Sequence, residues 1–445
     1  MSAPTDTIAA IATPPGRGGV GMVRVSGPAA TAICSALTGR LPPPRHAQLA
    51  TFRDADGQPI DLGLCLYFPA PHSFTGQDVV ELHGHGGPVV MDMLLARVLA
   101  LGARQAAPGE FSQRAFLNDK LDLAQAEAVA DLIDAASTAA VRAALRSLDG
   151  AFSRQIGALS ERLIELRVQI EAGLDFPDEE LDLLADGRLA TDAARLADEL
   201  RALVGRADEG RLLREGISVV LAGAPNVGKS SLLNALAERE AAIVTAIPGT
   251  TRDVLREYLA IDGLPLHLVD TAGLRDSHDP IEQEGMRRAR AEIARADQLL
   301  FVTEASAPQQ PPPELLAQAS ALTRVINKID LTGEPPRTEP AGGWTDVYLS
   351  VRSGAGLDLL RARIREAAGF AGTEGQFSAR RRHVEALRQA AESTARSAEL
   401  LAGRAGPELA AEELRLAQQA LGEITGQVSS DDLLGRIFAS FCIGK

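Results

Sequence analysis

The stretch "GISVVLAGAPNVGKSSLLNALA", residues 216–237, constrains the fold more than any other part of the sequence. Its apolar run predicts a buried strand at Ile217–Ala222, and the segment after the glycine-containing turn predicts a helix. The turn matches the pattern G-x-x-x-x-G-K-S from Gly223 to Ser230, in which backbone N–H groups surround phosphates. A strand, such a turn and a helix form the first unit of a parallel α/β sheet.

Further short motifs follow in order, each after an apolar run. "LHLVDTAG" places Asp270 at the end of a predicted strand, where a carboxylate near Mg²⁺ belongs, and Gly273 where its N–H can touch a γ-phosphate. "VINKID" supplies Asn327 and Asp330. A carboxylate that accepts two hydrogen bonds selects guanine, because its N1 and exocyclic amine are both donors. The motifs together predict a GTP-binding domain of the small-GTPase type.

Specific roles follow for this domain. Lys229 is expected to reach the β- and γ-phosphates and Ser230 to ligate Mg²⁺. Leu274 stands where Ras-like proteins carry a glutamine that orients water, so another group must orient it. Arg252 and Arg275 flank the switch motifs, and either an arginine finger or ordinary salt bridges fit them. The residues predicted to contact GTP are Asn226, Val227, Gly228, Lys229, Ser230, Ser231, Thr245, Ala246, Ile247, Pro248, Gly249, Thr250, Thr251, Asp270, Thr271, Ala272, Gly273, Asn327, Lys328, Asp330, Ser350, Val351 and Arg352.

The pattern of apolar and polar residues changes along the chain and predicts a multidomain fold that combines α/β and all-α parts. Residues 1–118 read as an α/β domain, with strands in "GVGMVRVSG", "DLGLCLYF" and "QDVVELHGHGG" and a helix from "PVVMDMLLARVLALG". Residues 121–148 and 156–174 have apolar residues three and four apart and predict long amphipathic helices. We expect a helical domain split into 119–210 and 376–445, with the G domain, 211–375, inserted between its two parts. "APQQPPPE" is too proline-rich for regular structure.

Composition narrows the class of protein. Three cysteines (Cys34, Cys65 and Cys442) at distant positions argue against a disulfide framework and for a reducing compartment. No secretory signal is recognisable, and no apolar run reaches the roughly 18 residues that span a bilayer. We therefore expect a cytoplasmic protein without a membrane partner. With a net charge of −14, any nucleic acid must bind a local basic patch.

Lysine is rare in this chain. Of 45 basic residues only four are lysines, and a general preference for arginine accounts for that bias. The lysines that remain are candidates for sites that need a compact ammonium group. Two of them, Lys229 and Lys328, lie in the nucleotide motifs, and the other two are Lys120 and Lys445.

The sequence resembles the MnmE (TrmE) family of bacterial tRNA uridine-modification GTPases over essentially its whole length. The resemblance rests on "GAPNVGKSS", "PGTTRD", "DTAGLR", "NKID", "FLNDKLDLAQAEAVADLIDA" and the terminal "CIGK". It implies an N-terminal domain that dimerises and binds a folate, a split helical domain and an inserted Ras-like G domain. It also implies that two G domains dimerise across the γ-phosphates in a potassium-dependent way that accelerates hydrolysis.

The resemblance assigns further roles to residues of this chain. Glu282 would position the attacking water through a second water, whereas on sequence alone it reads as a carboxylate at a helix N-terminus. Ser230 and Thr251 would hold Mg²⁺. The residues that would surround K⁺ are Asn226, Thr245, Ile247 and Thr250.

The resemblance also implies a chemistry and partners. Family members act as homodimers with MnmG (GidA), in a heterotetramer whose MnmG subunits supply FAD and use NADH. They install aminomethyl or carboxymethylaminomethyl groups at C5 of the tRNA wobble uridine, with 5,10-methylenetetrahydrofolate as the one-carbon donor. A folate needs a carboxylate for its pterin edge and cations for its glutamate tail. The matching positions are Arg24, Glu81, Lys120 and Lys445.

The C-terminal tail, "FASFCIGK", carries Cys442. Gly444 and Lys445 do not fit a prenylation box. The resemblance implies that Cys442 reaches the folate region and is needed for modification, and a glycine before the last residue favours a mobile, unpacked thiol. A small buried hydrophobe is the alternative.

Some charged residues have plainer interpretations. Arg24 fits an ordinary strand-end charge as well as a folate ligand. His83 and His85 lack a third metal ligand, so glycine-assisted close approach or a turn explains "HGHGG" better. Asp122 and Glu127 are expected on a solvated helix face. Residues 380–383, "RRRH", fit a phosphate contact or a solvated linker equally.

Two other functions remain open on the sequence. The G-domain motifs alone fit a regulatory GTPase of the Era/EngA type in ribosome assembly, against which the folate-like residues and "CIGK" stand. A helical scaffold whose G domain gates assembly with a partner overlaps with the favoured function, because GTP hydrolysis must drive a conformational change.

Overall fold

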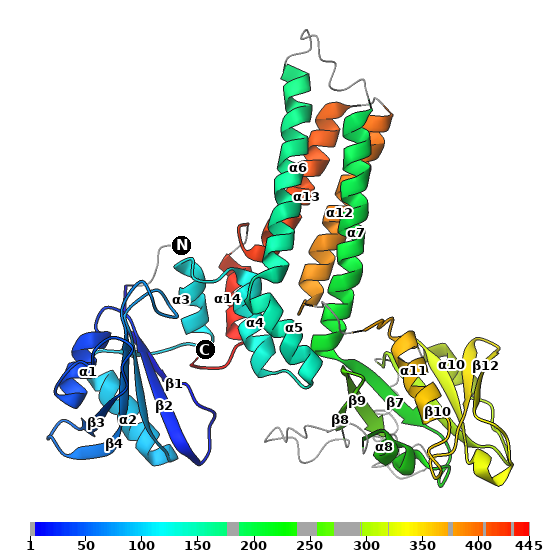
Figure 1. The fold of residues 1–445 in the computed structure, drawn as a ribbon, viewed down its shortest axis with the longest axis horizontal. Helices are drawn as coiled ribbons and strands as arrows, with labels where there is room; N and C mark the ends of the chain where they lie inside the picture. Colours follow the sequence, from blue (N-terminus) through cyan, green and yellow to red (C-terminus); the bar gives the residue numbers. More distant parts are fainter. Residues whose placement is uncertain are drawn as a thin grey trace. The chain divides into compact units, whose positions relative to one another are not determined.

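The structure, a computed structural model, describes residues 5–175, 187–237, 256–270, 294, 296–318, 320–372, 377–403, 406–428 and 431–444 (Figure 1). The chain divides into two compact units. Unit 1 contains residues 1–130, 153–161 and 418–445, and unit 2 contains residues 131–152 and 162–417.

Unit 1 begins with a six-stranded mixed sheet in the order β3-β4-β5-β2-β1-β6. Its strands are β1 (Ile8–Ile11), β2 (Gly18–Ser26), β3 (Gln48–Arg53), β4 (Pro59–Phe68), β5 (Val79–Gly86) and β6 (Arg104–Gln105). Helices α1 (Ala30–Thr38) and α2 (Pro88–Ala100) share one core with residues of this sheet, including Val23, Phe52 and Leu82. Strands β2, β4 and β5 and helix α2 lie where the sequence predicts them, whereas β1, β3 and β6 were not predicted.

The other face of β3 and β4 carries exposed leucines. Leu49 of β3 and Leu64 of β4 are direct partners across the two strands. Leu62 lies two residues before Leu64 on β4 and therefore on the same face. All three are more than two-fifths exposed, whereas the alternate residues Ala50 and Cys65 are buried. The sheet therefore has one packed face and one apolar face open to its surroundings within the described residues.

One of the two long helices that the sequence predicts is interrupted, whereas the one expected over 156–174 is present within residues 151–175. The long helix expected over 121–148 is two helices, α4 (Leu123–Ile133) and α5 (Thr138–Leu148). Ser137 begins α5, because its extended backbone lets the side chain accept a hydrogen bond from the Ala140 N–H at 3.1 Å. Ahead of them lies α3 (Glu110–Leu117), and the chain ends after α14 (Asp431–Ala439).

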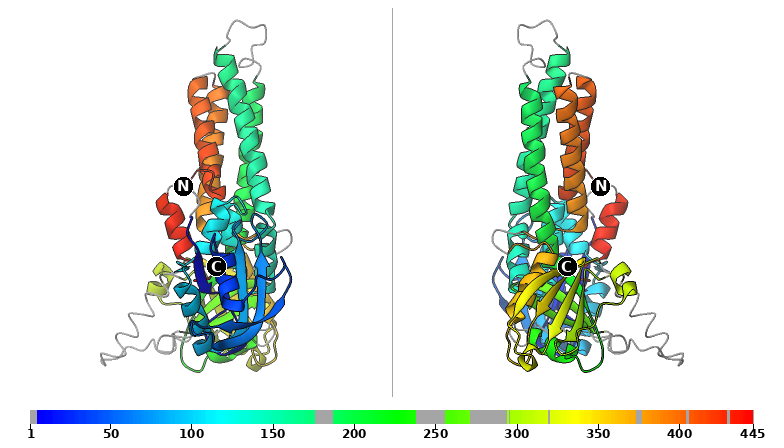
Figure 2. Two further views of the ribbon diagram at one scale, coloured as in Figure 1. Left: turned by 90° about the vertical axis from the view of Figure 1, so that its left-hand side faces the viewer. Right: turned by 90° about the vertical axis from the view of Figure 1, so that its right-hand side faces the viewer.

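Four long helices make up the remaining all-α part: α6 (Ala151–Asp175), α7 (Arg188–Glu215), α12 (Arg381–Ala402) and α13 (Pro407–Thr425). Within unit 2, α7 and α12 run side by side in all views (Figure 1, Figure 2). Their alanine- and leucine-rich stripes supply the buried residues of the pair.

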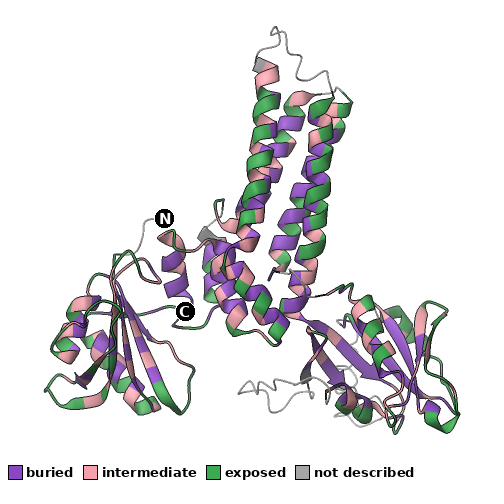
Figure 3. Ribbon diagram, viewed as in Figure 1, coloured by how far each residue is buried: buried purple, intermediate pink, exposed green. Residues whose placement is uncertain are grey.

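Unit 2 also holds a seven-stranded sheet in the order β12-β13-β11-β10-β7-β9-β8. Its strands are β7 (Ile217–Ala222), β8 (Arg256–Ile261), β9 (Leu264–Asp270), β10 (Gln298–Glu304), β11 (Leu322–Asn327), β12 (Arg337–Ala341) and β13 (Trp344–Tyr348). The five inner strands are parallel, and β8 and β12 pair antiparallel at the two edges. Strands β10 and β11 are almost wholly buried, as expected for parallel strands covered on both faces (Figure 3).

Short helices accompany this sheet: α8 (Lys229–Ala237), α10 (Pro313–Gln318), the 3₁₀ turn η1 (Ile329–Leu331) and α11 (Leu357–Ala367). The expected fold class, α/β domains together with an all-α part, is confirmed. Within the described ranges, no helix combines the length and apolar character needed to cross a bilayer.

Candidate functional site

The phosphate loop joins β7 to α8. Its first glycine, Gly223, has φ +142°, and a Cβ there would lie 2.2 Å from the Val302 carbonyl oxygen, so only glycine fits. The Lys229 ammonium donates hydrogen bonds to the Gly223 and Ala224 carbonyl oxygens at 2.7 and 2.8 Å. Ser230, the second residue of α8, is exposed. A cation and a hydroxyl at a helix N-terminus form a suitable anion and Mg²⁺ site.

Asn327 joins the phosphate loop to the guanine motif. Its side-chain amide donates to the Val227 carbonyl oxygen at 2.9 Å and accepts from the N–H groups of Lys328 and Val351 at 2.8 and 3.1 Å. A Cβ at Gly228 would lie 2.4 Å from the Asn327 amide nitrogen. Asn327 thus fixes three loops through one buried side chain, and Gly228 leaves the space that this contact needs.

Lys328 adds a second link between the loops. Its backbone is left-handed, and its ammonium donates to the Asn226 carbonyl oxygen at 2.9 Å and forms an ion pair with Glu304. Asn226 is also left-handed, with φ +64°. Asparagine is one of the few residues that adopt this conformation readily.

Asp330 is oriented as a base acceptor. The buried Ser350 hydroxyl donates to one carboxylate oxygen of Asp330 at 2.6 Å, and the Ser353 N–H donates to Ser350 at 3.2 Å. Asp330 itself is exposed, as is Arg352. The carboxylate is therefore held in place yet open to a ligand that presents two adjacent N–H donors, as guanine does.

Several predicted residues lie outside the described part of the chain. They are Thr245, Ala246, Ile247, Pro248, Gly249, Thr250, Thr251, Thr271, Ala272, Gly273, Glu282 and Lys445, together with Arg252, Leu274 and Arg275. Asp270 ends β9, as predicted.

In unit 1, Arg24 and Glu81 face each other across β2 and β5. The Arg24 guanidinium donates to one Glu81 oxygen from Nε and Nη2 at 3.1 and 3.0 Å. Its central carbon lies over the rings of Phe74 and Phe111, 5.6 and 5.7 Å from their centroids. Arg24 is thus a half-buried, paired cation and not merely a solvated strand end.

The C-terminal tail lies against this pair. The Gly444 carbonyl oxygen accepts from Arg24 Nη1 at 3.4 Å, and a Cβ on Gly444 would lie 2.7 Å from the Ile11 carbonyl oxygen. The Cys442 carbonyl oxygen accepts from the Gly109 N–H at 3.3 Å, while Cys442 itself is exposed. The exposed Cys442 agrees with the expected unpacked thiol and not with a buried one, whereas Gly444, which has no side chain, fits closely against β1.

Sequence reasoning missed Gly109, which places the start of α3 against the tail, and Arg114, which ties α3 to Asp6. Arg114 is fully buried and donates to Asp6 and Glu110. Burial raises the pKa of the Glu110 carboxyl, but hydrogen bonds from Arg104 and Arg114 outweigh this effect and hold the pKa below its usual range. Gly109 has φ +66°, and a Cβ there would lie 2.4 Å from the Phe438 carbonyl oxygen. In the sequence, the contact between Gly109 and Phe438 is signalled only by a glycine that directly precedes the acidic residue Glu110.

Other predicted residues have ordinary neighbours. Lys120 is exposed and donates to the Pro71 carbonyl oxygen at 3.0 Å. His83 and His85 lie beside Glu81 and Asp61, and no cluster of three metal-ligating side chains occurs among the described residues. Glu127 is 1 % exposed, so its assignment to a solvated face is wrong. It lies one helical turn after the buried Leu123, on the packed side of α4.

The "RRRH" cluster is not one solvated surface. Arg380 contacts Asp131 and His383 is buried, whereas Arg381 is exposed at the first residue of α12. Arg380 and His383 therefore have positions in the fold that the sequence did not reveal.

The three thiols differ in accessibility. Cys34 and Cys65 are fully buried, and their hydrogen bond and burial raise the pKa of the Cys65 thiol. Cys442 is exposed. We expect one thiol per chain to react quickly with Ellman's reagent in the folded protein and all three after denaturation, since reaction needs an accessible thiolate. Cys442→Ser should remove the fast phase, and a fast phase of more than one thiol would contradict this burial.

Comparison with known proteins places the chain in a family. The family described as "MnmE helical domain" matches residues 123–442, and "GTP-binding protein TrmE N-terminus" matches residues 7–120. The tRNA modification GTPase MnmE of Stutzerimonas stutzeri is 58% identical over 451 residues, which covers 99% of each chain. That of Chromohalobacter salexigens is 56% identical over 449 residues, covering 99% of this chain and 98% of the relative.

The chain belongs to the MnmE family of tRNA modification GTPases. The expected resemblance is thereby confirmed along the full length of the chain. Among solved structures, the G domain of the Thermotoga maritima FeoB iron transporter is 25% identical, with a TM-score of 0.27, over 34% of this chain and 98% of that chain. A variant of Aquifex aeolicus Era bound to GDP·AlF₄⁻ is 24% identical, with a TM-score of 0.27, over 40% of this chain and 66% of that chain.

Proposed function

We propose that this MnmE-family chain hydrolyses GTP and, together with MnmG (GidA), installs aminomethyl or carboxymethylaminomethyl groups at C5 of the wobble uridine of tRNA. One observation carries the GTP part: Asn327 ties the phosphate loop to the guanine loop, beside an Asp330 carboxylate held for a base. The tRNA part rests on full-length identity to tRNA modification GTPases.

Each described residue of the nucleotide site has a task in this proposal. The phosphate-loop N–H groups and Lys229 bind and neutralise the phosphates, and Asp330 accepts from guanine N1 and its amine. The exposed Ser230 hydroxyl fits one ligand position of Mg²⁺, and Thr251 would supply another. Glu282 would position the attacking water through a second water.

Potassium would act as a charge near the γ-phosphate, held by Asn226, Thr245, Ile247 and Thr250. Asn226 supports this assignment, because it is exposed at the phosphate loop while its own carbonyl oxygen accepts a hydrogen bond from Lys328. Two G domains would then pair across their nucleotides.

We expect GTP turnover to be on the order of tenfold or more faster in KCl than in NaCl at equal ionic strength, because charge at this position lowers the hydrolysis barrier. Asn226→Gly keeps the left-handed backbone and removes the side-chain oxygen, so it should erase the difference. Steady-state phosphate release measures both. Equal rates in the two salts for the unaltered chain would refute potassium activation.

The folate donor would bind near Arg24, Glu81, Lys120 and Lys445. The Arg24–Glu81 pair supports this, since a carboxylate suits the N–H edge of a pterin and a guanidinium suits carboxylates. The half-buried Phe74 ring beside Arg24 adds a flat surface against which a fused ring can lie. When bound, 5,10-methylenetetrahydrofolate supplies the one-carbon unit, and FAD on MnmG supplies redox chemistry with NADH.

We also propose a homodimer that forms a heterotetramer with MnmG in the cytoplasm. The exposed face of Leu49, Leu62 and Leu64 supports self-association, because such contiguous apolar surface usually marks an interaction site. The domain division proposed for the chain is 1–118, 119–210, 211–375 and 376–445, with the G domain as the third segment.

Deletion of the gene should remove C5-modified wobble uridines from tRNA, and the intact gene should restore them. Nucleoside mass spectrometry of tRNA from the source bacterium measures this. A gene with Lys229→Ala is the matched control, because it should fail to restore the modification while the protein remains present. Unchanged nucleosides after deletion would instead favour a regulatory GTPase of the Era/EngA type.

A further inference from the structure

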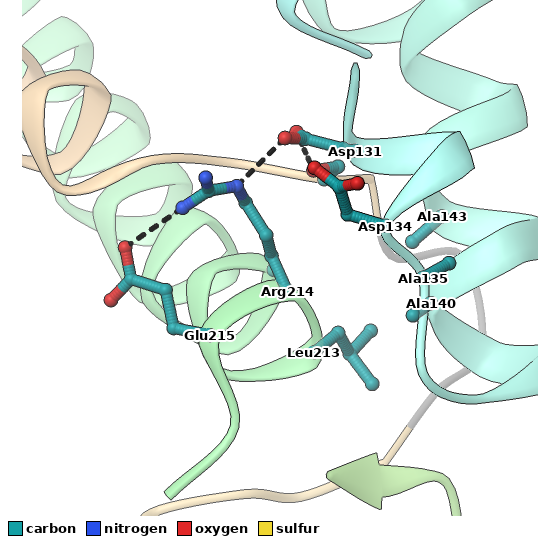
Figure 4. Close-up of a pocket in the computed structure, with 10 residues that line it drawn as sticks. Asp131, Asp134, Ala135, Ala140, Ala143, Leu213, Arg214 and Glu215 are labelled. Carbon is teal, nitrogen blue, oxygen red and sulfur yellow. Dashed lines mark hydrogen bonds and ion pairs between the residues drawn. The ribbon is translucent and has the colours of Figure 1, made fainter. Parts of the chain in front are cut away.

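Asp131, in unit 2, carries a buried charge that its neighbours already balance. Figure 4 shows Arg214 extending from the end of α7 toward this carboxylate. Asp131 Oδ1 accepts hydrogen bonds from Arg214 Nε and Arg380 Nη2, each at 2.7 Å. Gly210 lines the same pocket, and a Cβ there would lie 2.1 Å from the Phe377 carbonyl oxygen, so the backbone is closely packed. Charge pairing and packing account for this buried group.

The two buried thiols of unit 1 are different, because each lies directly against the other. Cys34 is on α1 and Cys65 is on β4, and both residues are 0 % exposed. Their Sγ atoms are 3.2 Å apart. The sulfur atoms of a disulfide lie about 2.05 Å apart, so the two thiols need to approach each other by only about 1 Å to form one. The core of the sheet therefore holds two thiols placed for a bond between them.

The two thiols lie close beneath the surface of the domain. Thr38, the half-buried last residue of α1, has its hydroxyl oxygen 4.0 Å from the Cys34 Sγ. Cys65 pairs with Gln48 of β3, which is an edge strand of the six-stranded sheet. Helix ends and edge strands are among the parts of a fold that open locally at low free energy. A small uncharged molecule of about the size of water can therefore reach the pair without global unfolding.

We propose that Cys34 and Cys65 are a redox-active pair, which hydrogen peroxide converts within the folded domain to a disulfide that ties α1 to β4. The pair is reduced in the structure, which is the expected resting state in a reducing compartment. Oxidation closes the segment 34–65 into a loop and restricts the unfolded chain, so it stabilises the N-terminal sheet. The inference is independent of GTP hydrolysis and of tRNA modification.

The reaction consumes one hydrogen peroxide for each pair of thiols. The hydrogen bond with Cys65 lowers the pKa of the Cys34 thiol, whereas this bond and burial raise the pKa of the Cys65 thiol. Cys34 therefore reacts first: its sulfur attacks the peroxide, the O–O bond breaks, and a sulfenic acid and one water form. The Cys65 sulfur then attacks the Cys34 sulfur, and the S–O bond breaks. The oxygen leaves with the Cys65 proton as a second water, so the two thiols lose two electrons and the peroxide gains them.

Mass spectrometry of the full chain after treatment with hydrogen peroxide tests the proposal. The chain carries Cys442→Ser, so that the exposed thiol does not react. We expect the mass to fall by about 2 Da, the two thiols that react after denaturation to disappear, and a digest to contain a peptide that joins Cys34 to Cys65. Dithiothreitol should reverse all three changes. The oxidised chain should also melt about 5 °C or more above the reduced one, because the bond restricts the unfolded segment 34–65.

Two further variants of the same chain test the order of the steps. Cys65→Ala removes the second thiol, so oxidation should stop at a sulfenic acid on Cys34, which dimedone labels once the chain is denatured. Cys34→Ala should give no such label on Cys65. Alanine is chosen because a buried serine would leave a hydroxyl without a partner.

The proposal is overturned if both thiols still react after peroxide treatment and denaturation. It is also overturned if the bond joins two chains, or if the melting temperature stays the same or falls, because the folded domain would then not accommodate the bond. These outcomes are measured on the chain that keeps Cys34 and Cys65, so they do not depend on whether the alanine variants fold.

Discussion

Asp330→Asn should lower the affinity of the chain for GTP on the order of a hundredfold or more and allow it to use xanthosine triphosphate. The carboxylate of Asp330 accepts from two guanine donors, and hydrogen bonds to charged groups contribute about 1.5–3 kcal/mol each. An amide offers one acceptor and one donor, which match the N1–H and C2 carbonyl of xanthine. The Ser350 hydroxyl would still hold the side chain in place.

Competition between the two nucleotides for a fluorescent analogue measures the change. Ser350→Ala is the matched control, because it removes the orienting hydrogen bond at 2.6 Å but keeps the carboxylate. It should weaken GTP binding only several-fold, as expected for one hydrogen bond, without any gain for xanthine. A variant Asp330→Asn that still prefers GTP would contradict the role of Asp330 in base selection.

Cys442→Ser should abolish wobble-uridine modification while GTP hydrolysis remains within about twofold, since the tail and the nucleotide site share no partner among the residues that the structure describes. A serine hydroxyl has nearly the shape of the thiol but is hardly ionised at neutral pH, so it lacks the nucleophile that a thiolate provides. The tail itself should stay in place. Its contacts to Gly109 and Arg24 come from the Cys442 and Gly444 carbonyl oxygens and need no thiol.

Reconstituted modification with MnmG, followed by nucleoside mass spectrometry, measures this loss. Ile443→Ala is a suitable control, because Ile443 is an exposed neighbour in the same tail. That variant should retain most of the activity. Full modification by Cys442→Ser would assign the cysteine a packing role and remove it from the chemistry.

Local patterns were enough to place the elements that carry their own signal. The strand Ile217–Ala222 and the start of α8 at Lys229 lie where the sequence predicts them. The apolar run, the glycine-containing turn and the helix are each recognisable from neighbouring residues alone. The break between α4 and α5 was missed. The alanine-rich stripe continues through residues 134–137, and only the cap at Ser137 ends the pattern.

Contacts between distant residues could not be predicted in the same way. Glu127 is buried, although its residue type is mostly solvated, because tertiary packing overrides that preference. Arg380 looked like part of a basic linker, yet its partner Asp131 lies 249 positions earlier. Arg24 and Glu81 were selected only because they match a family pattern. They lie close together because they are direct partners in the register of β2 and β5.

The close approach of Gly210 to Phe377 has a consequence for how such a chain could have arisen. The whole seven-stranded sheet and its helices lie between these two touching positions. A segment whose two ends meet can be added to a host protein, or cut out of it, without stretching the host backbone. The helices on either side would need only a short bridge in its place. The G domain is therefore positioned as a guest, which a helical host could have acquired at a single point between α7 and α12.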